Sequence, residues 1–350
     1  MSKQEYLALY RKYRPETFAD VVGQDHVVSI LKKSLADGNT AHAYLLTGSR
    51  GTGKTTIARI IAHELGTSTN DMYEIDAASN RGIDDIRDLR ENVRTLPFDS
   101  KYKVYIIDEV HMLTKEAFNA LLKTLEEPPA HAVFILATTE LDKVPETIIS
   151  RCQTYVFKKP SEQVLANQVI DVAKEEGYAV DRPAAELIAL LGDGSFRDTL
   201  GVLQKVITSG LSKDIDASMV TSVTGAPRST LINGLIEAIA EKNTSLAFAT
   251  IRQAGEEHVD MTVFFKMLLL KFRLALILRY APEEKSIFAS QISAEDMVFL
   301  EKLIAKKPAT ITSGSLEILL SSQQLGKYAS IATLPLEIAV MKIMGDVDNK

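Results

Sequence analysis

A glycine-rich segment that ends in lysine and threonine has the residue types and spacing to bind phosphate. Residues 48–55 match the phosphate-binding loop pattern G-x-x-x-x-G-K-[ST] at every specified position. The apolar run 43–47 before them predicts a short buried strand, and residues 54–65 carry apolar side chains at helical spacing up to Gly66. A strand, a glycine loop and a helix in this order predict a nucleoside triphosphate site.

The chemistry of such a loop assigns a task to each of its residues. Successive backbone N–H groups and the positive end of the helix dipole surround the phosphates. Lys54 would reach the β- and γ-phosphates, and Thr55 would be a ligand of Mg²⁺. A chance glycine-rich turn is the alternative, which the flanking strand and helix argue against. The residues expected to hold the nucleotide here are Gly48, Ser49, Arg50, Gly51, Thr52, Gly53, Lys54, Thr55 and Thr56.

Two acidic residues stand at the end of the apolar run 103–108: Asp108 is its last residue and Glu109 follows it. They predict where the metal ion and the attacking water would lie in the same site. Open α/β sheets bind ligands at the carboxyl ends of their strands, where Asp108 and Glu109 would lie. Asp108 would hold Mg²⁺, often through water, and Glu109 would orient the water that attacks the γ-phosphate. A solvated acidic pair at a strand end is the alternative.

Thr138 and Thr139 follow the apolar run 132–137, so one of their hydroxyls can point toward the γ-phosphate. This position fits a sensor, which is a hydroxyl that contacts the γ-phosphate. It fits equally well a threonine that is present only because β-branched residues suit strands. Arg151 is either a surface charge or an arginine supplied to phosphate on a neighbouring subunit.

Arg197, which lies near the start of a predicted helix after Gly194, could reach phosphate as well. A pairing with Asp193 or Asp198 is the alternative on sequence alone.

The composition is that of a soluble globular protein. The chain has 350 residues, 46% of them hydrophobic and 25% charged, with a formal net charge of −6. No apolar leader opens it, and its most apolar stretch, 261–278, contains three basic residues, so we expect a cytoplasmic protein without membrane spans. The single cysteine excludes an internal disulfide and any multi-cysteine zinc site. The mildly acidic charge disfavours broad DNA binding by an isolated chain.

The order of the predicted elements divides the chain into three parts. From about residue 41 to 157, strand-like and helical runs alternate, which is typical of a parallel sheet with helices on both faces. Strand signals fade after residue 160, and a second boundary is expected near 225–227. We therefore predict an α/β nucleotide-binding domain at 1–160, a helical domain at 161–225 and an all-α domain at 226–350.

Several motifs together resemble one known family. They are YRKYRPETFADVVGQ at 10–24, EIDAASN at 74–80, IDEVHML at 107–113, LEEPP at 125–129, LATT at 136–139 and SRC at 150–152. In this order they are similar to the gamma/tau subunits of the bacterial DNA polymerase III clamp loader, which are AAA+ ATPases. The match is dense to about residue 200 and mainly architectural beyond it.

The resemblance implies an α/β AAA+ P-loop domain with a parallel sheet, followed by an α-helical lid and an all-α collar that joins five subunits. It implies an ATP hydrolase that uses ATP and Mg²⁺, within a DNA-directed DNA polymerase complex, to load a sliding clamp during DNA replication. The implied partners are delta and delta-prime type clamp-loader subunits, further copies of this chain, the sliding clamp and primed-template DNA. Another AAA+ ATPase acting in branch migration or replication restart is the alternative, and a ring member that does not hydrolyse ATP is a weaker one.

The resemblance also assigns roles outside the phosphate loop. It makes Thr139 the first sensor, Arg151 the finger acting on ATP held by the adjacent subunit, and Arg197 the second sensor. Arg81 and Arg87 would face DNA phosphates, although exposed arginines are often merely solvated. The residues expected beside the adenine are Tyr10, Arg11, Pro15 and Val22.

The sequence departs from the family pattern at one internal position. The family usually inserts a four-cysteine zinc module after the P-loop helix, whereas residues 66–71 alone connect that helix to the 74–80 motif here. Zinc is therefore not expected. Because the sequence ends at Lys350, soon after the expected collar, we also expect a gamma-like chain without the tau-type extension.

Overall fold

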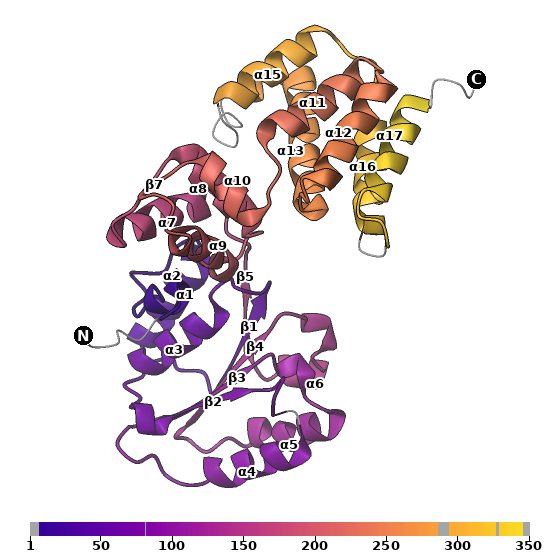
Figure 1. Ribbon diagram of the computed structural model, residues 1–350. Coiled ribbons are helices and arrows are strands. Elements are labelled where there is room, and N and C mark those ends of the chain that lie inside the picture. Colours follow the sequence, from indigo (N-terminus) through magenta and orange to yellow (C-terminus); the bar gives the residue numbers. More distant parts are fainter. Residues whose placement is uncertain (1–6, 81, 286–293, 327–328, 346–350) are drawn as a thin grey trace. The chain divides into compact units, whose positions relative to one another are not determined.

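The structure, a computed structural model, describes residues 7–80, 82–285, 294–326 and 329–345. Within these residues the chain forms two compact units (Figure 1). The first ends at Leu165 and also includes Gly192–Gly201, whereas the second contains Ala166–Leu191 and continues from Val202. The expected boundaries at 160/161 and 225/226 define three domains and stay a prediction.

A parallel sheet is the centre of the first unit. Among the described residues, its five strands lie in the order β2-β3-β4-β1-β5, and every neighbouring pair is parallel. The apolar runs predicted as buried strands form its middle, since β3, β4 and β1 are adjacent. The strands are β1 (Ala43–Gly48), β2 (Met72–Asp76), β3 (Lys103–Asp108), β4 (Ala132–Thr138) and β5 (Gln153–Phe157).

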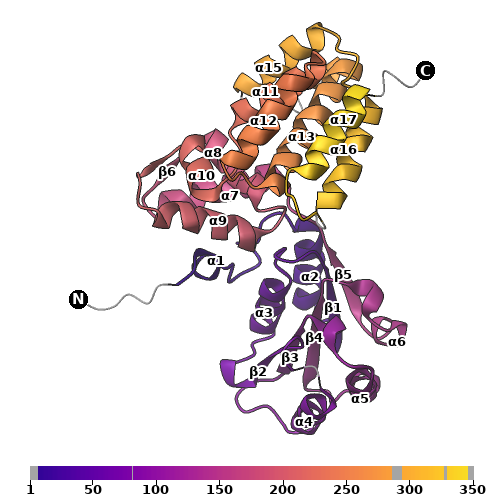
Figure 2. The ribbon, with the colours of Figure 1, turned by 45° about the vertical axis from the view of Figure 1, so that its right-hand side comes forward.

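Helices cover both faces of this sheet, because successive side chains of a strand point to opposite faces. Leu45 and Ile107 pack in a core with α4 and α5, which lie side by side in Figures 1 and 2. Their neighbours Leu46 and Ile106 pack in a second core with α2 and α3. The covering helices are α2 (Asp25–Ala36), α3 (Lys54–Glu64), α4 (Ile83–Val93) and α5 (Lys115–Glu126).

Further helical elements flank these strands and helices along the chain. The remaining elements that begin in the first unit are α1 (Leu9–Lys12), η1 (Thr69–Asp71), η2 (Val110–Met112), η3 (Leu141–Lys143), α6 (Glu146–Ile149), α7 (Glu162–Glu175) and α9 (Phe196–Thr208). The last two continue into the second unit.

The short connection between α3 and β2, residues 66–71, carries an anchor of its own, Asp71. Its side chain is fully buried, and its carboxylate accepts hydrogen bonds from the backbone N–H groups of Phe98, Asp99 and Ser100 at 2.6, 2.9 and 2.9 Å. Burial alone would raise the pKa of Asp71, but these bonds favour the carboxylate and lower its pKa to about 2. Asp71 therefore ties the 98–100 loop to the start of β2.

Replacement of Asp71 by asparagine is expected to lower the free energy of unfolding at pH 7 by about 1.5–3 kcal/mol, because the charge that strengthens these bonds is lost. The folded-state pKa lies below the unfolded-state value, so the contribution of Asp71 is complete above pH ~4 and disappears as the pH falls toward 2. Urea unfolding at several pH values measures both effects. Asp99→Asn, a change at a neighbouring exposed carboxylate, is the control. Equal stabilities of the two variants at pH 7 would contradict the anchor.

Where the structure describes it, the second unit is helical apart from two short strands, β6 (Ala179–Val180) and β7 (Asp214–Ile215), which pair in parallel. Its longest helix, α13, is lined by buried residues such as Phe264, Leu268 and Phe272, as expected for a helix buried in protein. None of the described helices has both the length and the hydropathy needed to cross a bilayer. The helices that belong wholly to this unit are α8 (Arg182–Leu191), α10 (Ala217–Thr224), α11 (Ser229–Ala240), α12 (Thr244–Glu256), α13 (Met261–Tyr280), η4 (Pro282–Glu284), α15 (Ala294–Ala305), α16 (Ser313–Gly326) and α17 (Leu334–Gly345).

Candidate nucleotide-binding site

The loop between β1 and α3 has the backbone geometry that its glycines predict. Gly51 and Gly53 have φ angles of +72° and +99°, a region that residues other than glycine rarely adopt. Gly53 is also the N-cap of α3. Gly51 also meets the segment 192–201, since its carbonyl accepts a hydrogen bond from the Phe196 N–H at 3.0 Å. A Cβ atom at Gly51 would lie 1.9 Å from Ser195 Oγ. The loop therefore needs glycine here both for its turn and for this close approach.

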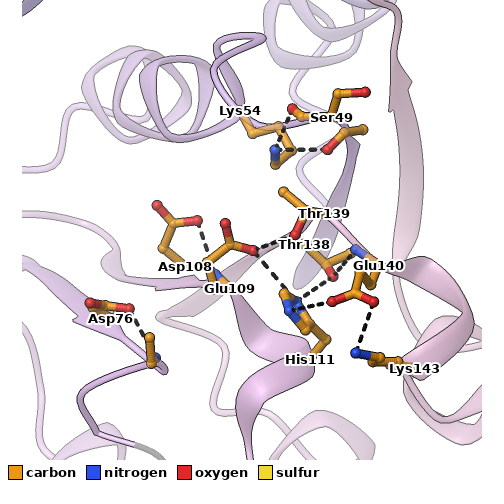
Figure 3. Close-up of polar contacts among 12 residues, drawn as sticks. Ser49, Lys54, Asp76, Asp108, Glu109, His111, Thr138, Thr139, Glu140 and Lys143 are labelled. Atoms are coloured by element: carbon orange, nitrogen blue, oxygen red, sulfur yellow. Dashed lines mark hydrogen bonds and ion pairs between the residues drawn. The ribbon is translucent and has the colours of Figure 1, made fainter. Parts of the chain in front are cut away.

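Lys54 is the first residue of α3, and its side chain folds back over the loop (Figure 3). Its Nζ donates hydrogen bonds to the carbonyl oxygens of Gly48 and Ser49 at 2.8 and 2.9 Å. Burial lowers the pKa of Lys54, an effect that the carboxylates of Glu109 and Asp108 oppose. The ammonium thus lies within the loop, at the positive end of the helix.

The loop threonine and the acidic end of β3 meet, as the sequence predicts. Thr55 Oγ1 donates a hydrogen bond to Asp108 Oδ2 at 2.7 Å. A hydroxyl and a carboxylate oxygen are hard ligands, and one or two such protein ligands beside phosphate oxygens are typical of Mg²⁺ sites. These two residues therefore fit the metal that the P-loop motif implies.

Glu109 reaches the site through an unusual backbone conformation. Its φ and ψ angles are 49° and 45°, in the left-handed region that costs a non-glycine residue about 1–2 kcal/mol. The Glu109 N–H donates to Asp108 Oδ1 at 3.0 Å, and Glu109 Oε2 accepts a hydrogen bond from Thr139 Oγ1 at 2.9 Å. The turn after β3 thus directs the Glu109 carboxylate toward the end of β4, where the predicted sensor threonine lies.

Histidine 111 is a member of this cluster that the motif reasoning did not single out. The His111 side chain is only 5% exposed, and its Nδ1 lies 3.0 Å from Thr138 Oγ1. The same atom is 3.4 Å from Glu109 Oε2, and Nε2 is 3.3 Å from Glu140 Oε1 (Figure 3). Its spacing of two residues after Glu109 was the available signal, but only the η2 turn brings the imidazole back to the strand ends.

The segment 192–201 brings Arg197 to the amino-terminal part of the chain. The Arg197 guanidinium lies over the Tyr10 ring, 4.9 Å from its centroid, and that of Arg11 lies at 5.8 Å. A hydrogen bond from Arg197 lowers the pKa of the Tyr10 phenol, and one from Arg11 lowers it by a smaller amount. Arg197 also packs beside the loop, since a Cβ atom added to Gly51 would lie 3.4 Å from the Cβ atom of Arg197. The structure therefore places Arg197 beside both the phosphate loop and two of the residues expected near the adenine.

A buried glutamine, Gln24, lies beside the phosphate loop. In the sequence it is only the last residue of the 10–24 motif. The side-chain Nε2 of Gln24 donates to the carbonyl of Lys158 at 2.8 Å and lies 3.5 Å from that of Thr52. Its Oε1 accepts the Lys158 N–H at 3.2 Å. Gln24 thus joins the phosphate loop to the chain that follows β5, a long-range contact that spacing could not reveal.

The other predicted site residues are not gathered into this cluster. Arg151 contacts Glu126 Oε1 at 2.7 Å and the carbonyl of Thr147 at 2.8 Å, so its guanidinium lies at the end of α5 and over α6. Pro15 is half-buried, whereas Val22 is exposed.

Of the two arginines expected near DNA, Arg87 is exposed on α4, and Arg81 lies outside the described residues. Across the described ranges, no group of three or more His, Cys, Asp or Glu side chains could hold a metal ion. The expected absence of zinc stays a prediction.

Comparison with known proteins shows which subunits this chain resembles. A family model described as the delta subunit of DNA polymerase III matches residues 67–161. The DNA polymerase III subunit tau of Bacillus subtilis is 38% identical over 360 aligned residues, which cover 97% of this chain and 63% of that protein. The chain is a homologue of the gamma/tau subunits of DNA polymerase III. The tau subunit of Escherichia coli is 39% identical to this gamma/tau homologue over 78% of the chain and 46% of the relative.

The gamma/tau homologue spans about half to two thirds of the length of these relatives. Its fold is shared with Thermotoga maritima RuvB, a Holliday junction branch migration motor, at a TM-score of 0.53 and 23% identity over 65% of this chain and 80% of RuvB. At this identity the likeness concerns the fold alone. It confirms the predicted fold, in which a parallel α/β domain is followed by helical segments.

Proposed function

We propose that this chain is an ATP-hydrolysing motor subunit of a replicative clamp loader, which uses ATP to place a sliding clamp on primed DNA. The observation that supports this proposal is the convergence of Lys54, the Thr55–Asp108 pair and the Glu109–Thr139 pair at one sheet edge, in a gamma/tau homologue. A protein that only bound nucleotide would need no carboxylate held ready beside a sensor hydroxyl.

The side chains suggest how the chain would act on ATP. The N–H groups of the loop and the Lys54 ammonium would bind the β- and γ-phosphates. A Mg²⁺ ion held by Thr55 and Asp108 would neutralise negative charge on those phosphates. The Glu109 carboxylate would orient the attacking water and accept its proton, and Thr139 would hold that carboxylate in place.

Two arginines would complete the site from different sources. Arg197, which stacks on Tyr10 beside the loop, would contact the phosphates as the second sensor within the same chain. Arg151, at the end of α5, would act as the finger on ATP held by an adjacent subunit. A finger that acts on a neighbour requires a ring, so we infer that delta and delta-prime type subunits and further copies of this chain are partners. The role in replication places the complex in the cytoplasm.

Steady-state ATP hydrolysis by the chain assembled with its delta-type subunits tests the proposal. We expect sliding clamp and primed-template DNA to stimulate turnover weakly when added separately and synergistically when added together. Stimulation by the two additions that is no more than additive would contradict clamp loading. Stimulation by branched or duplex DNA alone, with hexamers in solution, would instead support a branch-migration motor.

A further inference from the structure

The His111 imidazole lies between the carboxylate of Glu109, which follows β3, and that of Glu140, which follows β4. The hydroxyl of Thr138 and one oxygen of Glu109 face its Nδ1, and an oxygen of Glu140 faces its Nε2 (Figure 3). These distances are 3.0 Å to Thr138 Oγ1, 3.4 Å to Glu109 Oε2 and 3.3 Å to Glu140 Oε1. The ring is thus fixed at both nitrogens rather than packed as an apolar filler.

Glu140 makes two further contacts, one through its carboxylate and one through its backbone N–H. Lys143 Nζ contacts Glu140 Oε2 at 2.8 Å, and this hydrogen bond lowers the pKa of Glu140. The Glu140 N–H donates to Thr138 Oγ1 at 3.0 Å, the same hydroxyl that faces His111. A chain of contacts therefore runs from the surface residue Lys143 through Glu140 and His111 to Glu109.

A histidine that only filled space would not need these neighbours. His131 directly precedes β4, at the opposite end of that strand from Thr138, and contacts the backbone carbonyl of Val93 at 3.0 Å. His111 instead contacts the carboxylate of Glu109, the residue whose left-handed backbone directs that carboxylate into the site. Buried polar groups with several partners restrict the orientation of each partner.

We propose that His111 is a positioning residue that orients the Glu109 carboxylate for water activation and links it to the Glu140–Lys143 pair. This inference rests on the proposed ATPase function and adds to it a residue that acts through Glu109. It predicts that changes at Glu140 alter turnover, because Glu140 reaches Glu109 through His111.

The test compares His111→Ala with His131→Ala in the assembled complex. His111→Ala is expected to lower kcat about 10- to 100-fold, the range for loss of a charge-assisted contact that orients a reacting group, and to leave KM for ATP within about twofold. His131→Ala should leave both constants within about twofold of the original values. An unchanged kcat, or a raised KM at constant kcat, would overturn the inference.

Two further variants separate positioning from a loss of folding. Glu140→Gln changes a surface residue that is 43% exposed, and it should lower kcat about 2- to 5-fold. Combined with His111→Ala, it should add almost nothing, because both changes break one chain of contacts. In a Glu109→Gln background, His111→Ala should leave the residual single-turnover rate unchanged.

Full additivity, or a further loss of rate in the Glu109→Gln background, would reject the positioning role. Absence of ATP turnover in the unmodified complex would reject the proposed function itself. Normal turnover of the unmodified complex and of His111→Ala would reject only the inference.

Discussion

Replacement of Lys54 by alanine is expected to remove nucleotide binding and leave the fold intact. The ammonium contacts two carbonyl oxygens of its own loop, and it is the cation that the loop motif assigns to the β- and γ-phosphates. Truncating one partner of a buried charged contact costs about 2–5 kcal/mol, which is roughly 30- to 5,000-fold in affinity.

The measurement is the shift of the melting temperature by ATP with Mg²⁺, together with direct titration of a fluorescent ATP analogue. Ligand at about 100 times its Kd stabilises a protein by ~2.7 kcal/mol, which is readily detected. Lys115→Ala is the matched control, because Lys115 is the first residue of α5, just as Lys54 is the first residue of α3, but it is exposed. An ATP-induced shift in Lys54→Ala equal to that of the control would refute the assignment of the loop.

Replacement of Arg151 by alanine is expected to preserve ATP binding and to slow hydrolysis by the assembled complex at least about 100-fold. An arginine finger contributes about 10³–10⁵ to kcat in related phosphoryl transfers. In the described chain Arg151 pairs with Glu126 at the surface, and exposed pairs of this kind contribute only about 0–1 kcal/mol. Exchange of Glu126 for a phosphate on a neighbouring subunit would therefore cost little.

A comparison of single-turnover rates at saturating ATP checks this expectation. Glu126→Gln is the control, since it removes the partner of Arg151 but keeps the guanidinium, and its turnover should stay within about fivefold. Mixed complexes give a second readout, because Arg151→Ala subunits should still hydrolyse their own ATP when an unmodified neighbour provides the finger. Normal turnover in a complex assembled wholly from Arg151→Ala subunits would exclude the finger role.

The parts of the site that follow the chain locally could be predicted from the sequence. The apolar runs 43–47, 103–108 and 132–137 specify buried strands, and parallel strands bring their carboxyl ends to one edge of the sheet. The loop after the first run and the carboxylate that ends the second were therefore expected at one edge, where Thr55 bonds Asp108. The sequence left open which threonine hydroxyl serves the site. The structure separates them, because successive side chains diverge: Thr139 bonds Glu109, and Thr138 bonds His111.

The long-range contacts could not be predicted in the same way. The pairing of Phe196 with Gly51 and the stacking of Arg197 on Tyr10 join residues that no local pattern relates. The left-handed backbone of Glu109 is rare for a residue with a side chain, so propensity argues against it. The strands β6 and β7 are too short to show a period in the sequence.

The Asp71 anchor has a consequence for the conditions under which this segment stays folded. A module built on four cysteines depends on a supply of metal and on thiols that remain reduced, and chelators or oxidants unfold it. A carboxylate that accepts three backbone hydrogen bonds needs neither. The segment should therefore tolerate metal starvation and oxidative stress and should lose its hold on the 98–100 loop only in strong acid.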